Sequence, residues 1–445
     1  MSDVLQVTGP AQLRGCIAIA GDKSLSHRAV MLASLAQGTS HIDGFLPARD
    51  CLATLRAMQQ LGVSIACNNK TQLHIQGVGL TGLRASCYPL NCGGSATTMR
   101  LLAGVLAGQR FDAVITGNAQ LSRRPMARVV QPLAAMGARV HAVGSRGRAP
   151  MCIRACRGLC GRSFATQVAS AQLKSCLLLA GLFASGPTRV LQPHCTRQHT
   201  EHLLRSMGVT LHSHYIGVGT GQQHCVTLTP PQAPLQPLSM RIAGDPSSAA
   251  FFITAALLCR NSRVSINPVG LSSSRMGLFD TLQHMGARVM RQCLGTTAHE
   301  PWGRVVGRTS SLAAVELGAK QVVAAIDELP LLAVAATQAR GTTRVRQASE
   351  LRFKETDRIA GMTQQLQKMG AHITELADGF AVRGPTALKG ATVDSLGDHR
   401  LAMALLVAGL CAHGTTHVRG SGCIADSCPD FVRYLHQLGA RVQKQ

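Results

Sequence analysis

The sequence predicts an α/β protein built from six similar units in two domains. The first observation is a pattern that recurs at intervals of 69 to 84 residues. In each copy an apolar-periodic helix ends on Leu or Met, a glycine follows, and a short alternating stretch begins. A glycine just past a helix supplies the left-handed position that ends it, and alternation is typical of a strand. The glycines of the six copies are Gly62, Gly137, Gly208, Gly286, Gly370 and Gly439.

A second pattern lies between the copies of the first. An alanine- and leucine-rich helix ends, a turn of small residues follows, and a β-branched strand begins. Clear copies lie at 38–42, 186–190, 341–345 and 414–418, with weaker ones at 108–114 and 261–266. Each unit therefore holds two helices and several strands, and it is too long for a solenoid repeat. Six units divide into two domains of three, and the proline-rich segment 230–239 is the strongest linker signal between them.

The composition is that of a folded protein outside the membrane. Hydrophobic residues make up 46% and charged residues 15% of the 445 residues, which excludes a disordered chain. Aromatic residues are only 3%, which argues against a platform that stacks single-stranded bases. Apolar runs fall short of the roughly 18 residues of a membrane span, and the N-terminus lacks the features of a secretory signal. We therefore expect a cytoplasmic protein with no membrane partner.

The net charge of +24 allows two interpretations. Lys and Arg total 45, of which 37 are Arg, against 21 Asp and Glu. A polyanion-binding protein would gather its cations in blocks or on one helix face, whereas here they are scattered. Small, multiply charged anions fit this distribution better than nucleic acid does.

The sixteen cysteines form no C-x-x-C pair. The cluster Cys152, Cys156 and Cys160 is conceivable as a three-thiolate metal site, but no further cysteine pair or histidine pair completes a zinc pattern. We favour unrelated reduced thiols and expect no metal.

Four helix starts in the first half suit an anion. Segment 21–28 reads GDKSLSHR, and it is expected to open a helix through about residue 36, with Ser24 as N-cap and Lys23 beside the N-terminus. There the backbone N–H groups, the helix dipole and a cation converge. A Gly- and Thr-rich turn at 91–100 precedes an expected helix at 101–106, paired arginines occur at 121–126, and 169–174 opens a long apolar helix. The alternative for each motif is an ordinary helix start.

Three charged segments in the second half precede apolar helices. They are IDELP at 326–330, LRFKETDR at 351–358 and GDHR at 397–400, the last before an expected helix at 401–410. Surface salt bridges are the alternative, and they contribute little to stability. Against that alternative, all three segments stand at the starts of apolar helices, where a solvated charge cluster is not otherwise needed.

Eight co-linear segments together resemble the 5-enolpyruvylshikimate-3-phosphate synthase family from about residue 8 to residue 438. The resemblance implies a two-domain inverted α/β barrel, the enolpyruvyl transferase fold, with six βαβαββ repeats, three per domain. It implies an N-terminal domain of residues 21–240 and a C-terminal domain of residues 1–20 plus 241–445, with the active site in the cleft that domain closure seals. The segments are GDKSLSHR at 21–28, RPM at 124–126, ASAQLKS at 169–175, TRQHTE at 196–201, GDPSSAAFF at 244–252, IDELP at 326–330, KETDR at 354–358 and DHRLAM at 398–403.

The resemblance also implies a reaction of the shikimate pathway, which leads to chorismate and the aromatic amino acids. The enolpyruvyl group of phosphoenolpyruvate is transferred to the 5-hydroxyl of shikimate 3-phosphate, and phosphate is released. No cofactor or metal is implied, and the implied partners are the two substrates. Arg forks and helix N-termini suit the four anionic groups of these substrates.

The implied site residues fall into three groups. The implied catalytic residues are Asp327, Glu355 and Lys23. The implied shikimate 3-phosphate site comprises Lys23, Ser24, Arg28, Ser170, Gln172, Arg197, Asp327 and Lys354. The implied phosphoenolpyruvate site comprises Lys23, Ala96, Arg124, Gln172, Arg358 and Arg400.

Six positions depart from the family pattern. They are Gly94, Ala96, Asn118, Gln198, Asp426 and Cys428, the last of which stands where the family usually has Phe. The methyl group of Ala96, where the family usually has glycine, is expected to crowd larger mimics of phosphoenolpyruvate such as glyphosate. The carboxylate of Asp426 stands where the family has Thr or Lys, so it is expected to repel phosphoenolpyruvate.

Two rival functions stay open on the sequence. One is the related enolpyruvyl transfer to UDP-N-acetylglucosamine, and the other is anion or nucleic-acid binding with weakened or no catalysis. The acidic residues Asp327 and Glu355 argue against pure anion binding, which gains nothing from carboxylates. We expect a monomer that does not bind nucleic acid.

Overall fold

The computed structural model describes residues 3–445 and contains two compact units. Unit 1 comprises the chain up to Ala20 with Ala243–Thr296 and Pro301–Gln445, and unit 2 comprises Gly21–Ile242 with Thr297–Glu300. The proline-rich segment 230–239, predicted as a linker, lies inside unit 2. It packs there because Leu235 and Leu238 are buried and the strand that follows joins a sheet of unit 2.

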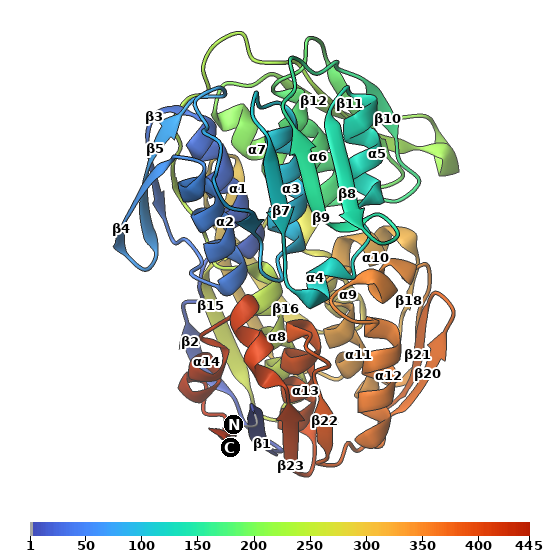
Figure 1. The fold of residues 1–445 in the computed structure, drawn as a ribbon. Helices are drawn as coiled ribbons and strands as arrows, with labels where there is room; N and C mark the ends of the chain where they lie inside the picture. Colours follow the sequence, from blue (N-terminus) through green and yellow to red (C-terminus); the bar gives the residue numbers. More distant parts are fainter. Residues whose placement is uncertain (1–2) are drawn as a thin grey trace. The chain divides into compact units, whose positions relative to one another are not determined.

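Unit 2 contains three four-stranded sheets of one design (Figure 1). In each sheet the first two strands in the order below are parallel, and every other neighbouring pair is antiparallel. The orders are β14 (Ser239–Arg241), β3 (Gln37–Asp43), β5 (Gln72–Val78), β4 (Ser64–Asn69); β6 (Leu90–Asn91), β7 (Ala113–Thr116), β9 (Arg148–Arg154), β8 (Arg139–Gly144); and β10 (Ser163–Ala165), β11 (Thr188–Gln192), β13 (Gln223–Leu228), β12 (Leu211–Ile216).

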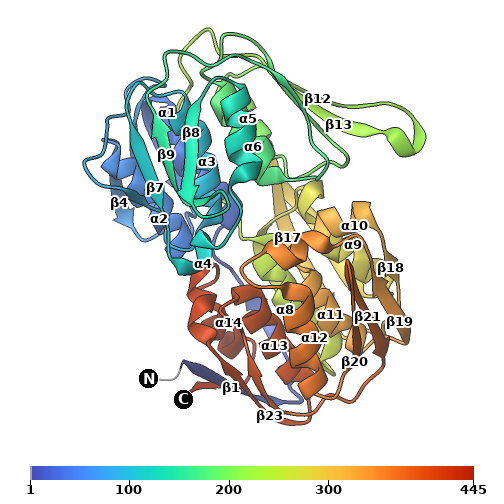
Figure 2. The same ribbon diagram turned by 45° about the vertical axis from the view of Figure 1, so that its right-hand side comes forward.

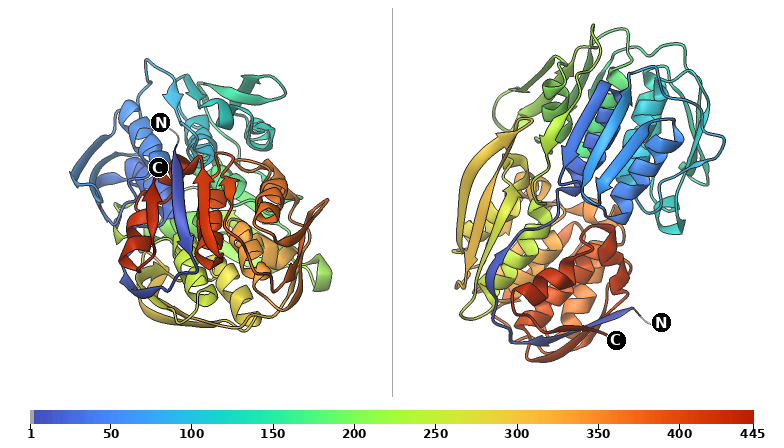
Figure 3. Two further views of the ribbon diagram at one scale, coloured as in Figure 1. Left: turned by 90° about the horizontal axis from the view of Figure 1, so that it is seen from below. Right: turned by 90° about the vertical axis from the view of Figure 1, so that its left-hand side faces the viewer.

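Unit 1 also contains three four-stranded sheets. One of them joins the two ends of the chain, because the N-terminal strand pairs on either side with strands from the C-terminal segment, as the left view of Figure 3 shows in blue and red. The orders are β22 (Thr392–Asp394), β23 (Gly414–Arg419), β1 (Val4–Gly9), β24 (Val442–Lys444); β18 (Glu316–Leu317), β19 (Gly341–Val345), β21 (Gly379–Gly384), β20 (His372–Leu376); and β16 (Arg288–Thr297), β17 (Glu300–Arg308), β15 (Arg263–Gly270), β2 (Arg14–Ile17).

Three helices form the centre of each unit, and nearly all their residues are buried. A helix that is apolar on every side is stable only inside a core, and these six helices fit that description (Figure 2). They are α1 (Lys23–Leu35), α3 (Ala96–Ala107) and α6 (Ala171–Gly181) in unit 2, and α8 (Pro246–Leu258), α11 (Leu329–Thr337) and α13 (His399–Cys411) in unit 1.

The remaining helices are shorter or only partly buried. They are α2 (Arg49–Gln60), α4 (Ala119–Ser122), α5 (Ala127–Ala135), α7 (His199–Ser206), α9 (Gly277–His284), α10 (Ala319–Ala325), α12 (Arg358–Lys368) and α14 (Phe431–Gln437), with 3₁₀ turns η1 (Gly219–Gly221), η2 (Ser273–Arg275), η3 (Ser349–Phe353) and η4 (Ser421–Asp426). No helix within residues 3–445 has the length and apolar character needed to cross a membrane.

The structure confirms the six predicted repeats. Each repeat supplies at least three strands of one four-stranded sheet, and three sheets belong to each unit. The six glycines of the first pattern each follow a helix and precede a strand, and their φ angles lie between 86° and 97°. A side chain at these positions would strain the backbone, so the glycines are required by the turn itself.

Three predicted helix starts were wrong by a few residues. The helix expected at 101–106 begins at Ala96 and the one expected at 401–410 begins at His399, because Ser95 and Asp398 cap them. The predicted N-cap Ser24 is a residue of helix α1. The cap is Asp22, whose side chain accepts a 2.8 Å hydrogen bond from the backbone N–H of Leu25.

Candidate active site

Five predicted site residues of unit 2 lie at the starts of its three central helices, and they are Lys23, Ser24, Ala96, Ser170 and Gln172. Each helix has a polar N-cap whose side chain accepts a backbone N–H bond; these caps are Asp22, Ser95 and Ser170. The first N–H groups of a helix have no partner within the helix, and with the dipole they favour an anion. The local sequence therefore brings anion-binding groups to one end of each central helix.

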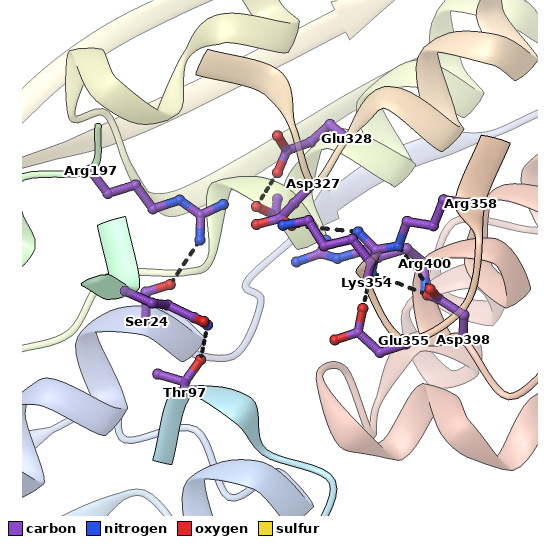
Figure 4. A network of polar contacts seen from close by, with 12 residues as sticks. Ser24, Thr97, Arg197, Asp327, Glu328, Lys354, Glu355, Arg358, Asp398 and Arg400 are labelled. Carbon is purple, nitrogen blue, oxygen red and sulfur yellow. Dashed lines mark hydrogen bonds and ion pairs between the residues drawn. The ribbon is translucent and has the colours of Figure 1, made fainter. Parts of the chain in front are cut away.

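Lys23 and Ser24 open helix α1. The Nζ of Lys23 lies 2.5 Å from a carboxylate oxygen of Asp50 on α2, and both side chains are about 15% exposed. The hydroxyl of Ser24 accepts a 3.1 Å hydrogen bond from Nη1 of Arg197 (Figure 4). Thus Ser24 and Arg197, which the sequence assigned to one anion site, are in contact.

Arg28 is buried within the packing of α1, α6 and α7. Its Nε donates to the Thr200 hydroxyl at 2.8 Å, its Nη2 donates to the Ser175 hydroxyl at 2.8 Å, and its Nη1 donates to the Ser24 carbonyl at 2.9 Å. These bonds hold the start of α1 against two other helices. Direct contact between Arg28 and a substrate stays a prediction, and what the structure shows is a supporting role for this guanidinium.

Gln172 connects helices α6 and α3. Its amide nitrogen donates to the Thr97 hydroxyl at 2.9 Å, and its amide oxygen accepts from Nη1 of Arg100 at 2.6 Å. Arg100 also donates to the carbonyl of Pro125 at 3.2 Å, next to the buried Arg124. These contacts bring the predicted residues Gln172 and Arg124 to one region of unit 2, beside Ala96 at the start of α3.

The sequence assigned no role to four residues of these contacts. They are Thr97, Arg100, Ser175 and Thr200. Thr97 and Arg100 stand inside a motif that the sequence did single out, and the others stand inside ASAQLKS and TRQHTE. The sequence therefore indicated that these residues belong to functional motifs, but it did not indicate which side chain each of them contacts.

The predicted residues of unit 1 gather around one buried guanidinium. Nε of Arg358 donates to Asp398 at 2.8 Å, Nη2 donates to Glu355 at 2.7 Å, and Nη1 lies 3.4 Å from Asp327 (Figure 4). Asp327 also accepts from Nζ of Lys354 at 3.2 Å. The two predicted acid–base residues, Asp327 and Glu355, thus share one cationic partner.

The charges around Arg358 fix its protonation. Burial by itself would lower the pKa of its guanidinium, but the carboxylates of Asp398, Glu355 and Asp327 outweigh that effect and raise the pKa well above its ordinary value. Arg358 is therefore a permanent cation, and a permanent cation nearby favours the ionised form of the carboxylates that contact it.

Asp398 has two roles that the sequence did not separate. Its carboxylate caps α13 by accepting the backbone N–H of Arg400 at 2.8 Å, and the same group is the strongest partner of Arg358. It is fully buried. The sequence could indicate the N-cap in GDHR because a cap is a local feature. It could not indicate the pairing with Arg358, because the two residues are forty positions apart.

Arg400 keeps one buried donor without a hydrogen bond. Its Nη1 has no hydrogen-bond partner among residues 3–445, and its guanidinium carbon lies 5.8 Å from the ring centre of Phe251. An unsatisfied buried donor is costly in a folded protein and is expected at a position where a ligand completes the bonding. The site around Arg358 and Arg400 therefore suits an added anion.

Two departures from the family pattern are neighbours in space. A Cβ placed on Gly94 would lie 3.3 Å from the amide nitrogen of Asn118. The Asn118 side chain caps the short helix α4 by accepting the N–H of Leu121 at 2.9 Å.

Two other departures lie elsewhere in the fold. Gln198 occupies the N-cap position of α7 but makes no side-chain cap bond, and Asp426 ends η4.

All sixteen cysteines are free thiols in the structure. Cys156 donates to the carbonyl of Gly158 at 3.2 Å. Within residues 3–445 no group of three or more His, Cys, Asp or Glu side chains is placed to hold a metal ion.

The fold is that of the enolpyruvyl transferases. The chain superposes on the enolpyruvyl transferase NikO from Streptomyces tendae with a TM-score of 0.78 at 19% identity, over 100% of this chain and 99% of that one. It superposes on a solved EPSP synthase from Acinetobacter baumannii with a TM-score of 0.86 at 36% identity, and the match covers all of both chains. These likenesses confirm the predicted fold class.

The sequence comparisons narrow the class to one family. The model of the family EPSP synthase (3-phosphoshikimate 1-carboxyvinyltransferase) matches residues 7–435. The chain is also 44% identical over 429 residues to the 3-phosphoshikimate 1-carboxyvinyltransferase of Geobacter sulfurreducens, covering 96% of this chain and 97% of that relative. The chain belongs to the EPSP synthase family.

Proposed function

We propose that this protein transfers the enolpyruvyl group of phosphoenolpyruvate to the 5-hydroxyl of shikimate 3-phosphate and releases phosphate. Membership in the EPSP synthase family supports the reaction class. The observation that carries the proposal is the cluster in which Asp327 and Glu355 share the buried cation Arg358. Binding of anions needs cations alone, whereas addition to the carbon of an enol phosphate also needs groups that take and give protons.

We assign the anionic groups of the two substrates to the helix starts and arginines of both units. The proposed shikimate 3-phosphate site comprises Lys23, Ser24, Arg28, Ser170, Gln172, Arg197, Asp327 and Lys354. Phosphoenolpyruvate is held by Arg124, Arg358 and Arg400, with Lys23, Gln172 and Ala96 beside it. As the sequence predicted, we propose that residues of units 1 and 2 serve one pair of substrates and that domain closure excludes water from them.

Asp327 is the general base for the 5-hydroxyl in this proposal. The ammonium of Lys354 at 3.2 Å and the guanidinium of Arg358 at 3.4 Å both favour its ionised form. An ionised carboxylate can accept the hydroxyl proton as the oxygen attacks the substituted carbon of phosphoenolpyruvate. The departing phosphate later takes up that proton.

Glu355 is the proposed acid for the methylene carbon, and its contact with Arg358 suggests how the acid is formed. While Nη2 of Arg358 lies 2.7 Å away, the carboxylate stays ionised and cannot donate a proton. The carboxylate of bound phosphoenolpyruvate competes for the same guanidinium. Once Glu355 has lost this partner it can take up a proton from solvent, give it to the methylene carbon, and recover it from the methyl group when phosphate leaves.

The proposal is tested by measuring phosphate release from phosphoenolpyruvate with and without shikimate 3-phosphate. We expect release only when both are present, and a loss of at least about 100-fold in Asp327→Ala, because one positioned base contributes roughly 10²- to 10⁴-fold. The matched control is Asp280→Asn, which removes a half-exposed carboxylate of unit 1 that pairs with Arg291. This control should retain wild-type turnover.

Three outcomes would contradict the proposal. They are phosphate release that does not need shikimate 3-phosphate, turnover of UDP-N-acetylglucosamine in its place, and salt-dependent retention on DNA without any phosphate release. Of these rivals the nucleotide-sugar reaction is not favoured, because the matching family and the relative at 44% identity are both named 3-phosphoshikimate 1-carboxyvinyltransferase.

A further inference from the structure

A buried polar cluster in unit 1 lies next to the proposed base but has no role in the site described above. It consists of Asp245, Ser247, Arg275 and Glu328, each at most 5% exposed. Asp245 and Ser247 belong to the segment GDPSSAAFF and Glu328 belongs to IDELP, whereas Arg275 lies in no motif that the sequence singled out. Buried charges are retained in proteins when they are paired and hydrogen-bonded, so this cluster calls for an explanation.

The cluster forms one hydrogen-bonded chain across three elements. Nη2 of Arg275, the last residue of η2, donates to the Asp245 carboxylate at 2.9 Å and to the Ser247 hydroxyl at 2.7 Å. The Ser247 hydroxyl in turn donates to the carboxylate of Glu328. Asp245 is also the N-cap of α8, because it accepts the backbone N–H of Ser247 at 2.7 Å. A single guanidinium therefore anchors the start of α8 and, through Ser247, the carboxylate of Glu328.

Glu328 occupies the N-cap position of α11, but its side chain does not cap that helix. The carboxylate points instead to Ser247 of α8, while its backbone carbonyl accepts the N–H of Leu332 at 3.0 Å. Asp327 lies directly before it, in the short turn between α10 and α11. Since a turn residue has no helical ladder of its own, its orientation depends on how its neighbours are tied down.

We propose that Ser247 and Arg275 are positioning residues that orient Asp327 through Glu328. The Ser247 hydroxyl fixes the Glu328 side chain, the fixed side chain holds the second half of the turn, and the turn aims the Asp327 carboxylate toward Lys354 and Arg358. Arg275 keeps the Ser247 oxygen in place by donating to it. This inference rests on the proposed function, because it deepens the account of the base in that reaction.

The inference predicts a change in kcat rather than in substrate affinity. Displacing a catalytic group by about 1 Å can reduce the rate by roughly 10²-fold. We therefore expect Ser247→Ala to lower kcat by about 10- to 100-fold, with KM for either substrate changed less than about threefold. Glu328→Ala should behave in the same way, whereas Glu328→Gln, whose amide oxygen still accepts from Ser247, should keep at least about a third of wild-type kcat.

The matched control for lost stability is Thr337→Ala. Thr337 is fully buried at the other end of α11, and its hydroxyl donates to the Val334 carbonyl at 2.7 Å. Removing this bond disturbs the same helix without touching the turn at residue 327. Urea unfolding of both alanine variants shows whether they lose similar stability, and only Ser247→Ala is expected to lose kcat.

The decisive measurement repeats Ser247→Ala in an Asp327→Ala background. If Ser247 acts through Asp327, its removal has no further effect on the residual rate once the base is gone. A further loss of about tenfold or more in that background, or equal kcat in Ser247→Ala and Thr337→Ala, would overturn the inference. If Ser247→Ala does not fold, a kcat for Glu328→Gln as low as that of Glu328→Ala would overturn it equally.

The failure of the proposed function looks different. In that case the wild-type protein releases no phosphate from the substrate pair, and both the function and the inference fall. If the wild type turns over normally and the four variants do not follow the expected pattern, only the positioning role falls.

Discussion

The ion pair between Lys174 and Glu201 provides the most direct test of the structure of unit 2. Lys174 lies on α6 and Glu201 on α7, both side chains are completely buried, and Nζ lies 2.5 Å from Oε1. Lys174 also donates to the carbonyl of Thr196 at 3.4 Å. Neither carboxylate oxygen of Glu201 has a hydrogen-bond partner among residues 3–445, so the lysine charge is what compensates it.

The expected change in the free energy of unfolding follows from the dependence of the Glu201 carboxylate on the Lys174 charge. Removing one partner of a buried pair leaves an uncompensated charge and costs about 3 to 5 kcal/mol, whereas replacing both partners by apolar residues of similar size is often neutral or stabilising. We therefore expect Lys174→Met to lower the free energy of unfolding by about 3 to 5 kcal/mol. The double variant Lys174→Met with Glu201→Leu should recover most of that loss.

Urea unfolding of the wild type, both single variants and the double variant measures the coupling between the two residues. The single tryptophan, Trp302, lies on β17 in unit 1, so its fluorescence reports that unit, while circular dichroism reports both. Because Lys174 lies in unit 2, we expect Lys174→Met to unfold at a lower urea concentration by circular dichroism before any change appears in the fluorescence of Trp302. The reasoning is refuted if Lys174→Met loses less than about 1 kcal/mol, or if the losses of the single variants simply add in the double variant.

Three further predictions concern pH and inhibition. Burial alone would raise the pKa of Glu300, but His199 at 2.6 Å and His202 at 3.0 Å hold it well below its usual range. Its contribution to stability is therefore complete above about pH 4.5 and is lost progressively as the pH falls from there through the depressed pKa of the folded state. Glu300→Gln should cost about 1 to 3 kcal/mol at pH 7 and less at pH 3 in urea titrations, whereas an equal cost at both pH values would contradict this. Burial and a neighbouring lysine lower the pKa of His224 to about 4, so the free energy of unfolding decreases as the pH falls from about 6.5 to 4. His224→Phe should make this decrease smaller by about 2 to 3 kcal/mol, and an unchanged decrease would count against the prediction. Ala96→Gly should gain roughly tenfold or more in glyphosate sensitivity in an inhibition titration, and equal sensitivity of both proteins would exclude crowding by the methyl group.

Local patterns predicted the architecture well. The positive φ of a residue such as Gly62 is a property of one turn, and the sequence shows it directly. The apolar character of α8 or α13 on every side likewise predicts a buried central helix. The starts of several of these helices were predicted to bind anions because capping and anion binding follow from a few consecutive residues, whereas the role of each candidate residue came from the resemblance to the family.

The partners of those residues were not predictable in the same way. The three nitrogen atoms of Arg28 bond to Ser24, Ser175 and Thr200, partners that the sequence did not indicate, and its contact with a ligand stays a prediction. Ser24 was expected to cap α1, yet Asp22 does so. Such choices depend on which side chains the packing brings within hydrogen-bond reach, and sequence spacing does not contain that information.

The sequence by itself determined which segments form the six repeats and which helix starts carry charge, because these are short-range properties of the backbone and of periodicity. Only the tertiary structure decided that Arg358, beside its near neighbour Glu355, also gathers Asp327 and Asp398, and that Arg275 anchors the cluster beside the proposed base. The physical reason is that a hydrogen bond acts over about 3 Å. Residues separated by thirty or more positions meet at that distance only after the central helices have packed.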